Sequence, residues 1–204
     1  MTGIRLLATP WLMGLAGCAV FGGGGDAPPE RPSNACEIFA EKEDWYPAAR
    51  KAAERWGVPI ALQLAFIKQE SGFQAEVRPP RQKFLGLIPT TRPSSAYGFG
   101  QALESTWEGY ERATGNGGAD RDDFGDVTDF IGWYCSISHQ KLGIAKHDAY
   151  NQYLAYHEGQ GGYARRTFES KGWLVKVARR VEMQTQQYGD QLIGCVAELE
   201  SGNE

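Results

Sequence analysis

Most of the helical segments expected in this chain stop at a glycine, and the positions of these glycines constrain the fold more than any other feature. A glycine readily adopts the left-handed conformation that a chain needs just after a helix ends. Strand signals are nearly absent, although residues 83–89 have the composition of one short hairpin arm. The sequence therefore predicts an all-α fold. The expected helices cover residues 43–56, 59–70, 102–114, 126–142, 148–158 and 173–188.

The first 17 residues are expected to form a lipoprotein signal peptide. Their apolar run is too short for a membrane-spanning helix, which needs about 20 apolar residues. The segment Leu15-Ala16-Gly17-Cys18 resembles a bacterial lipobox, in which the cysteine is lipidated and becomes the new N-terminus. An ordinary cleaved signal with a chance cysteine is the alternative. Ala19 follows, which in bacteria with two membranes resembles a signal for sorting to the outer membrane.

The remainder of the chain divides into three parts by composition. Residues 18–35 contain four consecutive glycines, prolines and charges without an apolar period, so we expect a lipidated cysteine and a flexible tether. Residues 36–195 are long enough for a single folded domain with a real core. Residues 196–204 are expected to be a C-terminal tail.

Three short stretches carry polar groups that are able to converge on one site. The apolar helix that follows Pro59 ends on Glu70, where Gly72 lets the chain turn away sharply. The second stretch is residues 95–101, SAYGFGQ, and the third is residues 155–159, AYHEG. A single glutamate at a helix end is more often a solvated surface residue. The presence of all three stretches favours a functional site.

Together the three stretches resemble the soluble lytic transglycosylases, goose-lysozyme-like enzymes that cleave peptidoglycan glycan strands. The family's Glu-Ser pair matches Glu70-Ser71, its Gly-Leu-Met-Gln stretch matches residues 98–101, and its Ala-Tyr-Asn stretch matches residues 155–157, with Gly159 shortly after. The resemblance covers residues 36–195. There are three departures from the family pattern: Gly100 replaces Met, His157 replaces Asn, and residues 78–93 lengthen the spacing between the first two stretches.

The resemblance implies a lysozyme-like fold and a reaction with one catalytic carboxyl group. A single protonated Glu70 would donate to the oxygen between N-acetylmuramic acid and N-acetylglucosamine, then act as base on the muramic 6-hydroxyl, which closes on C1 as a 1,6-anhydro sugar. Ser71 and Gln101 would hydrogen-bond the sugar or its N-acetyl group, and Tyr156 would orient Glu70 through its hydroxyl. Alternatively, Gln101 caps the next helix and Tyr156 is a core residue. The other supporting residues are Gly98, which together with Gly100 would let the polysaccharide approach the backbone, and Tyr97 and His157.

Two other functions remain open at this point. A hydrolytic lysozyme of the same fold usually needs a second carboxylate, to attack the sugar or to activate water. A non-catalytic lipoprotein would use the cleft only to hold the wall, although the presence of Glu70, Gln101 and Tyr156 argues against it. The candidates for a second carboxylate are Glu104, Asp120, Asp122, Asp123 and Asp126, although such clustered acids are more often a solvated loop or a helix cap.

Composition limits the partners and the chemistry further. The net charge of −4 gives no sign of nucleic-acid binding, and the three histidines show no ligand spacing, so we expect no metal and no cofactor. Lipidation of Cys18 would leave three cysteines, for which we expect a Cys36–Cys195 disulfide, with Cys36–Cys135 as the alternative. The expected protein is a periplasmic monomer that is lipid-anchored to the outer membrane and acts on peptidoglycan.

The segment 78–93 emerges between two of the three motif stretches, so we expect it to lie beside the cleft. Its apolar centre, residues 84–88, would pack on the domain. Its cations would meet the carboxylates of stem peptides, unless it is simply a solvated loop stiffened by prolines.

Overall fold

The structure is a computed structural model, and it describes residues 27–81, 83–84, 88–89, 92 and 94–201. The expected signal peptide, the lipidated Cys18 and residues 18–26 of the tether lie outside the described residues, as do residues 202–204 of the tail. None of the helices in the described part of the chain is both long enough and apolar enough to cross a membrane.

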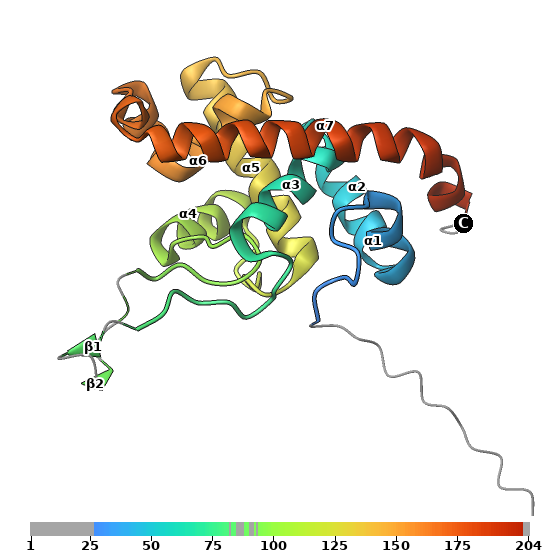
Figure 1. Cartoon of the computed structure of the whole chain (residues 1–204), viewed down its shortest axis with the longest axis horizontal. Coiled ribbons are helices and arrows are strands. Elements are labelled where there is room, and N and C mark those ends of the chain that lie inside the picture. The colour runs from blue at the N-terminus through green and yellow to red at the C-terminus, as the bar shows by residue number, and fades with distance from the viewer. Residues whose placement is uncertain (1–26, 82, 85–87, 90–91, 93, 202–204) are drawn as a thin grey trace, which may run out of the picture.

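The described residues confirm an all-α, lysozyme-like fold. Helix α7 runs along one side of the molecule and covers α3 and α6, while α2 packs against α5 (Figure 1). The helices are α1 (Ala35–Glu41), α2 (Trp45–Trp56), α3 (Ile60–Ser71), α4 (Glu104–Thr114), α5 (Phe124–Leu142), α6 (Ala149–Ala164) and α7 (Gly172–Ser201), with a short 3₁₀ helix, η1 (Thr167–Ser170), before α7. The sequence analysis did not predict α1 or η1.

Helix α3 forms the centre of the core. Seven consecutive residues of α3, 61–67, are buried, because α2, α5 and α7 all pack around it. The helix ends at Ser71, and Gly72 follows in the left-handed conformation (φ 60°), as expected for this position. The end of the core helix therefore carries Glu70 to the edge of the packed interior.

The expected helix after residue 173 does not stop at Gly189 but continues to Ser201. A glycine inside a helix costs about 1 kcal/mol relative to alanine, so other contacts must offset it. Cys195, on the continued part of α7, is joined to Cys36 on α1 by a disulfide, and the side chain of Gln191 accepts a hydrogen bond from the first backbone amide of α1. Most of the expected C-terminal tail is therefore helical. The remaining cysteine, Cys135, is a free thiol buried in the core.

The folded domain also begins earlier than expected. Pro29 is buried, and the hydroxyl of Tyr188 donates to the carbonyl oxygen of Pro32. Gln187 and Gln191 both donate to the carbonyl oxygen of Ser33. Pro32 and Ser33, expected in the tether, therefore lie against α7.

Two strands confirm the hairpin arm. Strand β1 (Lys83–Phe84) pairs with β2 (Ile88–Pro89) in an antiparallel register, and Figure 1 places both strands well away from the helices. The expectation that the centre of this segment packs on the domain is therefore wrong for these strands. Nearer the body, the Arg92 guanidinium donates to the carbonyl oxygen of Pro79 at 2.6 Å, which ties the two limbs of the arm together.

Candidate active site

The three motif stretches meet at one cleft of about 460 Å³. The end of α3 provides its carboxyl group, the loop before α4 provides one wall, and α5 and the middle of α6 provide the others. The residues that line it are Glu70, Ala96, Gln101, Ala102, Leu103, Thr106, Phe130, Tyr134, Tyr156, His157, Glu158 and Gly159. The tertiary fold thus brings together segments that are up to 89 positions apart (70 to 159).

Glu70 is the acid of this cleft. Its side chain leaves the last turn of α3 and is partly buried. The aromatic residues Phe130 and Tyr134 line the same cleft. Burial raises the pKa of the Glu70 carboxyl from 4.5 to about 7, because the charged form loses hydration, while a hydrogen bond with Tyr153 lowers it in part. A large fraction of Glu70 is therefore protonated at neutral pH, as a general acid requires.

The tyrosine that hydrogen-bonds Glu70 is Tyr153, which the sequence analysis did not single out. We expected Tyr156 to orient Glu70, but the Tyr156 hydroxyl donates to the carbonyl oxygen of Gly100 at 2.6 Å. Tyr156 thereby ties the second motif loop to α6. Tyr153 lies three residues earlier on α6, and residues three apart share a helix face, which is the signal that would have found it.

The two glycines of the second motif allow the protein to pack closely on itself. Gly98 has φ 78°, and a Cβ atom there would lie 1.8 Å from the carbonyl oxygen of Arg121. A Cβ atom on Gly100 would lie 3.0 Å from the Tyr156 hydroxyl oxygen. We expected these glycines to make room for the polysaccharide, whereas the space that they leave is occupied by the domain itself.

Gln101 lines the cleft in a left-handed conformation with φ 48°. Its side-chain nitrogen donates to the carbonyl oxygens of Val77 and Gly98, both at 2.9 Å. The side-chain oxygen of Gln101 is thus the group left to accept a hydrogen bond from a sugar N-acetyl group. Tyr97 is not among the residues that line the cleft, and its hydroxyl donates to Asp122 at 2.6 Å.

Ser71 does not face the cleft. Its side chain is buried, and its hydroxyl donates to the carbonyl oxygen of Ile67 at 3.1 Å. Successive helical residues point about 100° apart, which follows from 3.6 residues per turn, and at this step Ser71 is turned into the core while Glu70 lines the cleft. The expected contact between Ser71 and the sugar is not supported by this geometry.

Glu158 is a second carboxylate in the cleft, and the sequence analysis missed it. Lys171 donates to both of its oxygens, at 2.7 and 2.9 Å, and Thr167 donates to one of them. The Nδ1 atom of His157 lies 3.2 Å from the other. Burial alone would raise the pKa of the Glu158 carboxyl, but hydrogen bonds from Lys171, Thr167 and His157 lower it to about 2.

The acids that the sequence offered as second carboxylates lie elsewhere, because none of them lines the cleft. Asp123 accepts a hydrogen bond from the backbone of Asp126 and caps α5, and Asp126 in turn accepts one from the backbone of Asp120. In the described part of the chain, no three histidine, cysteine or acidic side chains are grouped as a metal site requires.

A helical domain with a half-buried acid at the end of its core helix, facing an open cleft, defines a lysozyme-like class of protein. A family model described as the transglycosylase SLT domain matches residues 6–195, and the chain belongs to this family. The match begins inside the segment expected to be the signal peptide. No curated protein matches the chain well enough to be compared with it.

Proposed function

We propose that the protein is a peptidoglycan lytic transglycosylase that cleaves the β-1,4 bond between N-acetylmuramic acid and N-acetylglucosamine. The observation that carries this proposal is the raised pKa of Glu70, about 7, in a cleft that all three motif stretches line. A non-catalytic sugar cleft has no need of a carboxyl group whose pKa is raised close to neutral.

In the proposed reaction, Glu70 acts twice. The protonated carboxyl donates its proton to the glycosidic oxygen, and the bond from that oxygen to C1 of the muramic residue breaks. The Glu70 carboxylate then takes the proton of the muramic 6-hydroxyl, whose oxygen forms the new bond to C1. The products are a 1,6-anhydro end and a free 4-hydroxyl on the leaving sugar, and no water is consumed.

The state of Glu158 supports the transglycosylase over a hydrolase. A hydrolase usually needs a second carboxylate that is free to attack C1 or to activate water. The Glu158 side chain is 4% exposed and is held by Lys171, Thr167 and His157. A carboxylate engaged in this way is a poor nucleophile and a poor base, so Glu70 is left as the acid that can do both steps.

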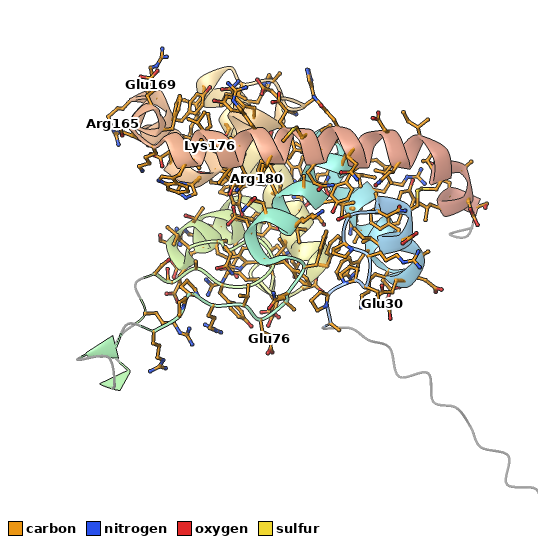
Figure 2. All side chains as sticks on the ribbon, viewed as in Figure 1. Glu30, Glu76, Arg165, Glu169, Lys176 and Arg180 are labelled. Atoms are coloured by element: carbon orange, nitrogen blue, oxygen red, sulfur yellow. A yellow bond between two sulfur atoms is a disulfide. The ribbon has the colours of Figure 1, made fainter. Side chains whose placement is uncertain are left out.

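The products released from purified peptidoglycan sacculi distinguish these functions by mass spectrometry. A transglycosylase releases anhydro ends, which are lighter by one water than the reducing ends that a hydrolase makes. We expect anhydro products from the native protein and a loss of about 10²–10⁴-fold in rate for Glu70→Gln, which keeps the shape but has no proton to transfer. Glu76→Gln, at an exposed carboxylate outside the cleft, is the matched control and should keep full activity (Figure 2).

Reducing ends would assign the protein as a lysozyme. Absence of any product from the native protein would favour the non-catalytic alternative. Full activity of Glu70→Gln would remove Glu70 from the mechanism.

We also infer that the protein acts in the periplasm, anchored to the outer membrane through Cys18. With the domain beginning near Pro29, residues 19–28 are left to connect the proposed anchor to the domain. Cys18→Ala should leave a catalytically competent protein that no longer fractionates with membranes. A variant that still sediments with membranes would show that the anchor lies elsewhere.

A further inference from the structure

Trp173 is an exposed aromatic residue beside the cleft that the reaction does not use. It lies in the first turn of α7, and its side chain is 57% exposed, the one aromatic residue among the large exposed apolar side chains of the described residues. Its ring meets the His157 ring edge-on, with 5.2 Å between centroids and 77° between planes. Because His157 lines the cleft, the Trp173 ring is one contact removed from the cleft wall.

Hydrogen bonds to the buried Glu158 carboxylate fix the position of the Trp173 ring. Lys171, two residues before Trp173, is bonded to the buried Glu158 carboxylate, which also contacts His157. Thr167 of η1 donates to the same carboxylate. One buried charge therefore joins α6, η1 and the start of α7, and it holds both rings in one arrangement. An exposed Trp with a rigid support is typical of a binding platform, because little conformational freedom is lost when a ligand stacks on it.

The position of Trp173 beside the cleft indicates which ligand would stack on it. The substrate in the proposed function is a polymer of pyranose rings, which must continue out of the cleft on both sides of the cleaved bond. A pyranose ring has an apolar face of C–H groups, and an indole offers a large flat apolar surface with a polar edge. Leu103, 47% exposed, also lines the cleft and adds apolar surface to it.

We propose that Trp173 and His157 form an additional sugar-binding subsite, which stacks a pyranose ring of the glycan strand beyond the two sugars at the cleaved bond. This inference rests on the proposed function, since it takes the glycan strand as the ligand. The subsite lies outside the reacting centre, so it should affect the affinity for long strands and leave the chemical step on short ones unchanged.

The test measures binding without cleavage. The protein carries Glu70→Gln, and isothermal titration calorimetry gives its Kd for peptide-free GlcNAc–MurNAc strands of two and eight sugars. Adding Trp173→Ala should weaken binding of the eight-sugar strand by about 3- to 10-fold, the size expected for one stacked ring, and change the two-sugar Kd little. Trp173→Phe should keep part of the affinity, because an aromatic face remains.

Met183→Ala is the matched control, since Met183 is 58% exposed on the same helix and does not line the cleft. It should leave both Kd values unchanged, and circular dichroism should show that each variant keeps the helical fold. Trp173→Ala binding the eight-sugar strand as tightly as the parent would overturn the subsite while leaving the proposed function intact. An equal loss on both strands would also overturn it, because it would indicate a distorted cleft.

Two further results separate this inference from its alternatives. If the Glu70→Gln protein with an intact Trp173 binds neither strand, the subsite and the proposed function fall together. An exposed Trp is also suited to a membrane surface, where cations such as Lys176 and Arg180 on the same helix would face anionic lipids (Figure 2). Loss of binding to phosphatidylglycerol vesicles on Trp173→Ala, with unchanged glycan binding, would overturn the subsite in favour of that role.

Discussion

Replacing Glu70 by Gln should stabilise the protein while it lowers the rate of cleavage, and the gain in stability should depend on pH. Because burial raises the pKa of the Glu70 carboxyl from 4.5 to about 7, the folded state holds this proton more tightly than the unfolded chain does. Stability from this carboxyl is fully present below about pH 4.5 and is lost as pH rises through about 7. At 1.36 kcal/mol per pH unit, the total loss is roughly 3 kcal/mol.

Glutamine has no proton to lose, so Glu70→Gln does not pay this penalty at high pH. The free energy of unfolding of Glu70→Gln, relative to that of the native protein, should be roughly 3 kcal/mol larger at pH 8 than at pH 4. For a domain of this size, that corresponds to a gain of about 6–12 °C in the Tm difference. Contacts that Gln makes or breaks at every pH cancel when the two pH values are compared.

Urea unfolding at pH 4, 6 and 8, followed by circular dichroism, measures this difference. Glu76→Gln is the control, because Glu76 is exposed and lies only a few residues after α3. A relative stability of Glu70→Gln that is the same at pH 4 and pH 8 would refute the raised pKa, and with it the reason for assigning Glu70 as the general acid.

Three other outcomes follow from the described contacts. Tyr153→Phe removes the hydrogen bond that lowers the pKa of Glu70, so the fall in activity above about pH 7 should move to higher pH. Initial rates measured from pH 5 to 9 test this, and a fall in activity at the same pH as in the native protein would contradict the prediction. Gly98→Ala should cost more than about 2 kcal/mol in urea unfolding, because its Cβ meets a backbone oxygen at positive φ. Gly118→Ala, with open space around its Cβ, should change stability by under about 1 kcal/mol, and similar values for the two glycine variants would argue against the clash. Cys195→Ser opens a disulfide loop with a sequence separation of 159 and should cost about 2–5 kcal/mol, measured against the native protein with and without reductant.

The helical architecture was predictable because its signals are local. An apolar run closed by a glycine specifies a helix and its end without reference to the rest of the chain, as at Gly57, Gly72, Gly115 and Gly143, each of which is left-handed after a helix. The same rule failed at Gly189, where the disulfide and the contacts of α7 with α1 carry the helix through a residue that would otherwise end it.

The site divides in the same way. By itself the sequence placed Glu70 at the end of a buried helix and identified three stretches that meet at the cleft. This was possible because residue type and the spacing of apolar residues can be determined directly from the sequence. Only the tertiary structure decided that Tyr153 contacts this carboxyl, that Arg121 fills the space beside Gly98, and that Lys171 neutralises Glu158. These partners lie 13 to 83 positions apart, and no local preference selects them. They are set by how the helices and the loops between them pack, since a buried polar group must find its partner wherever this packing brings one within reach.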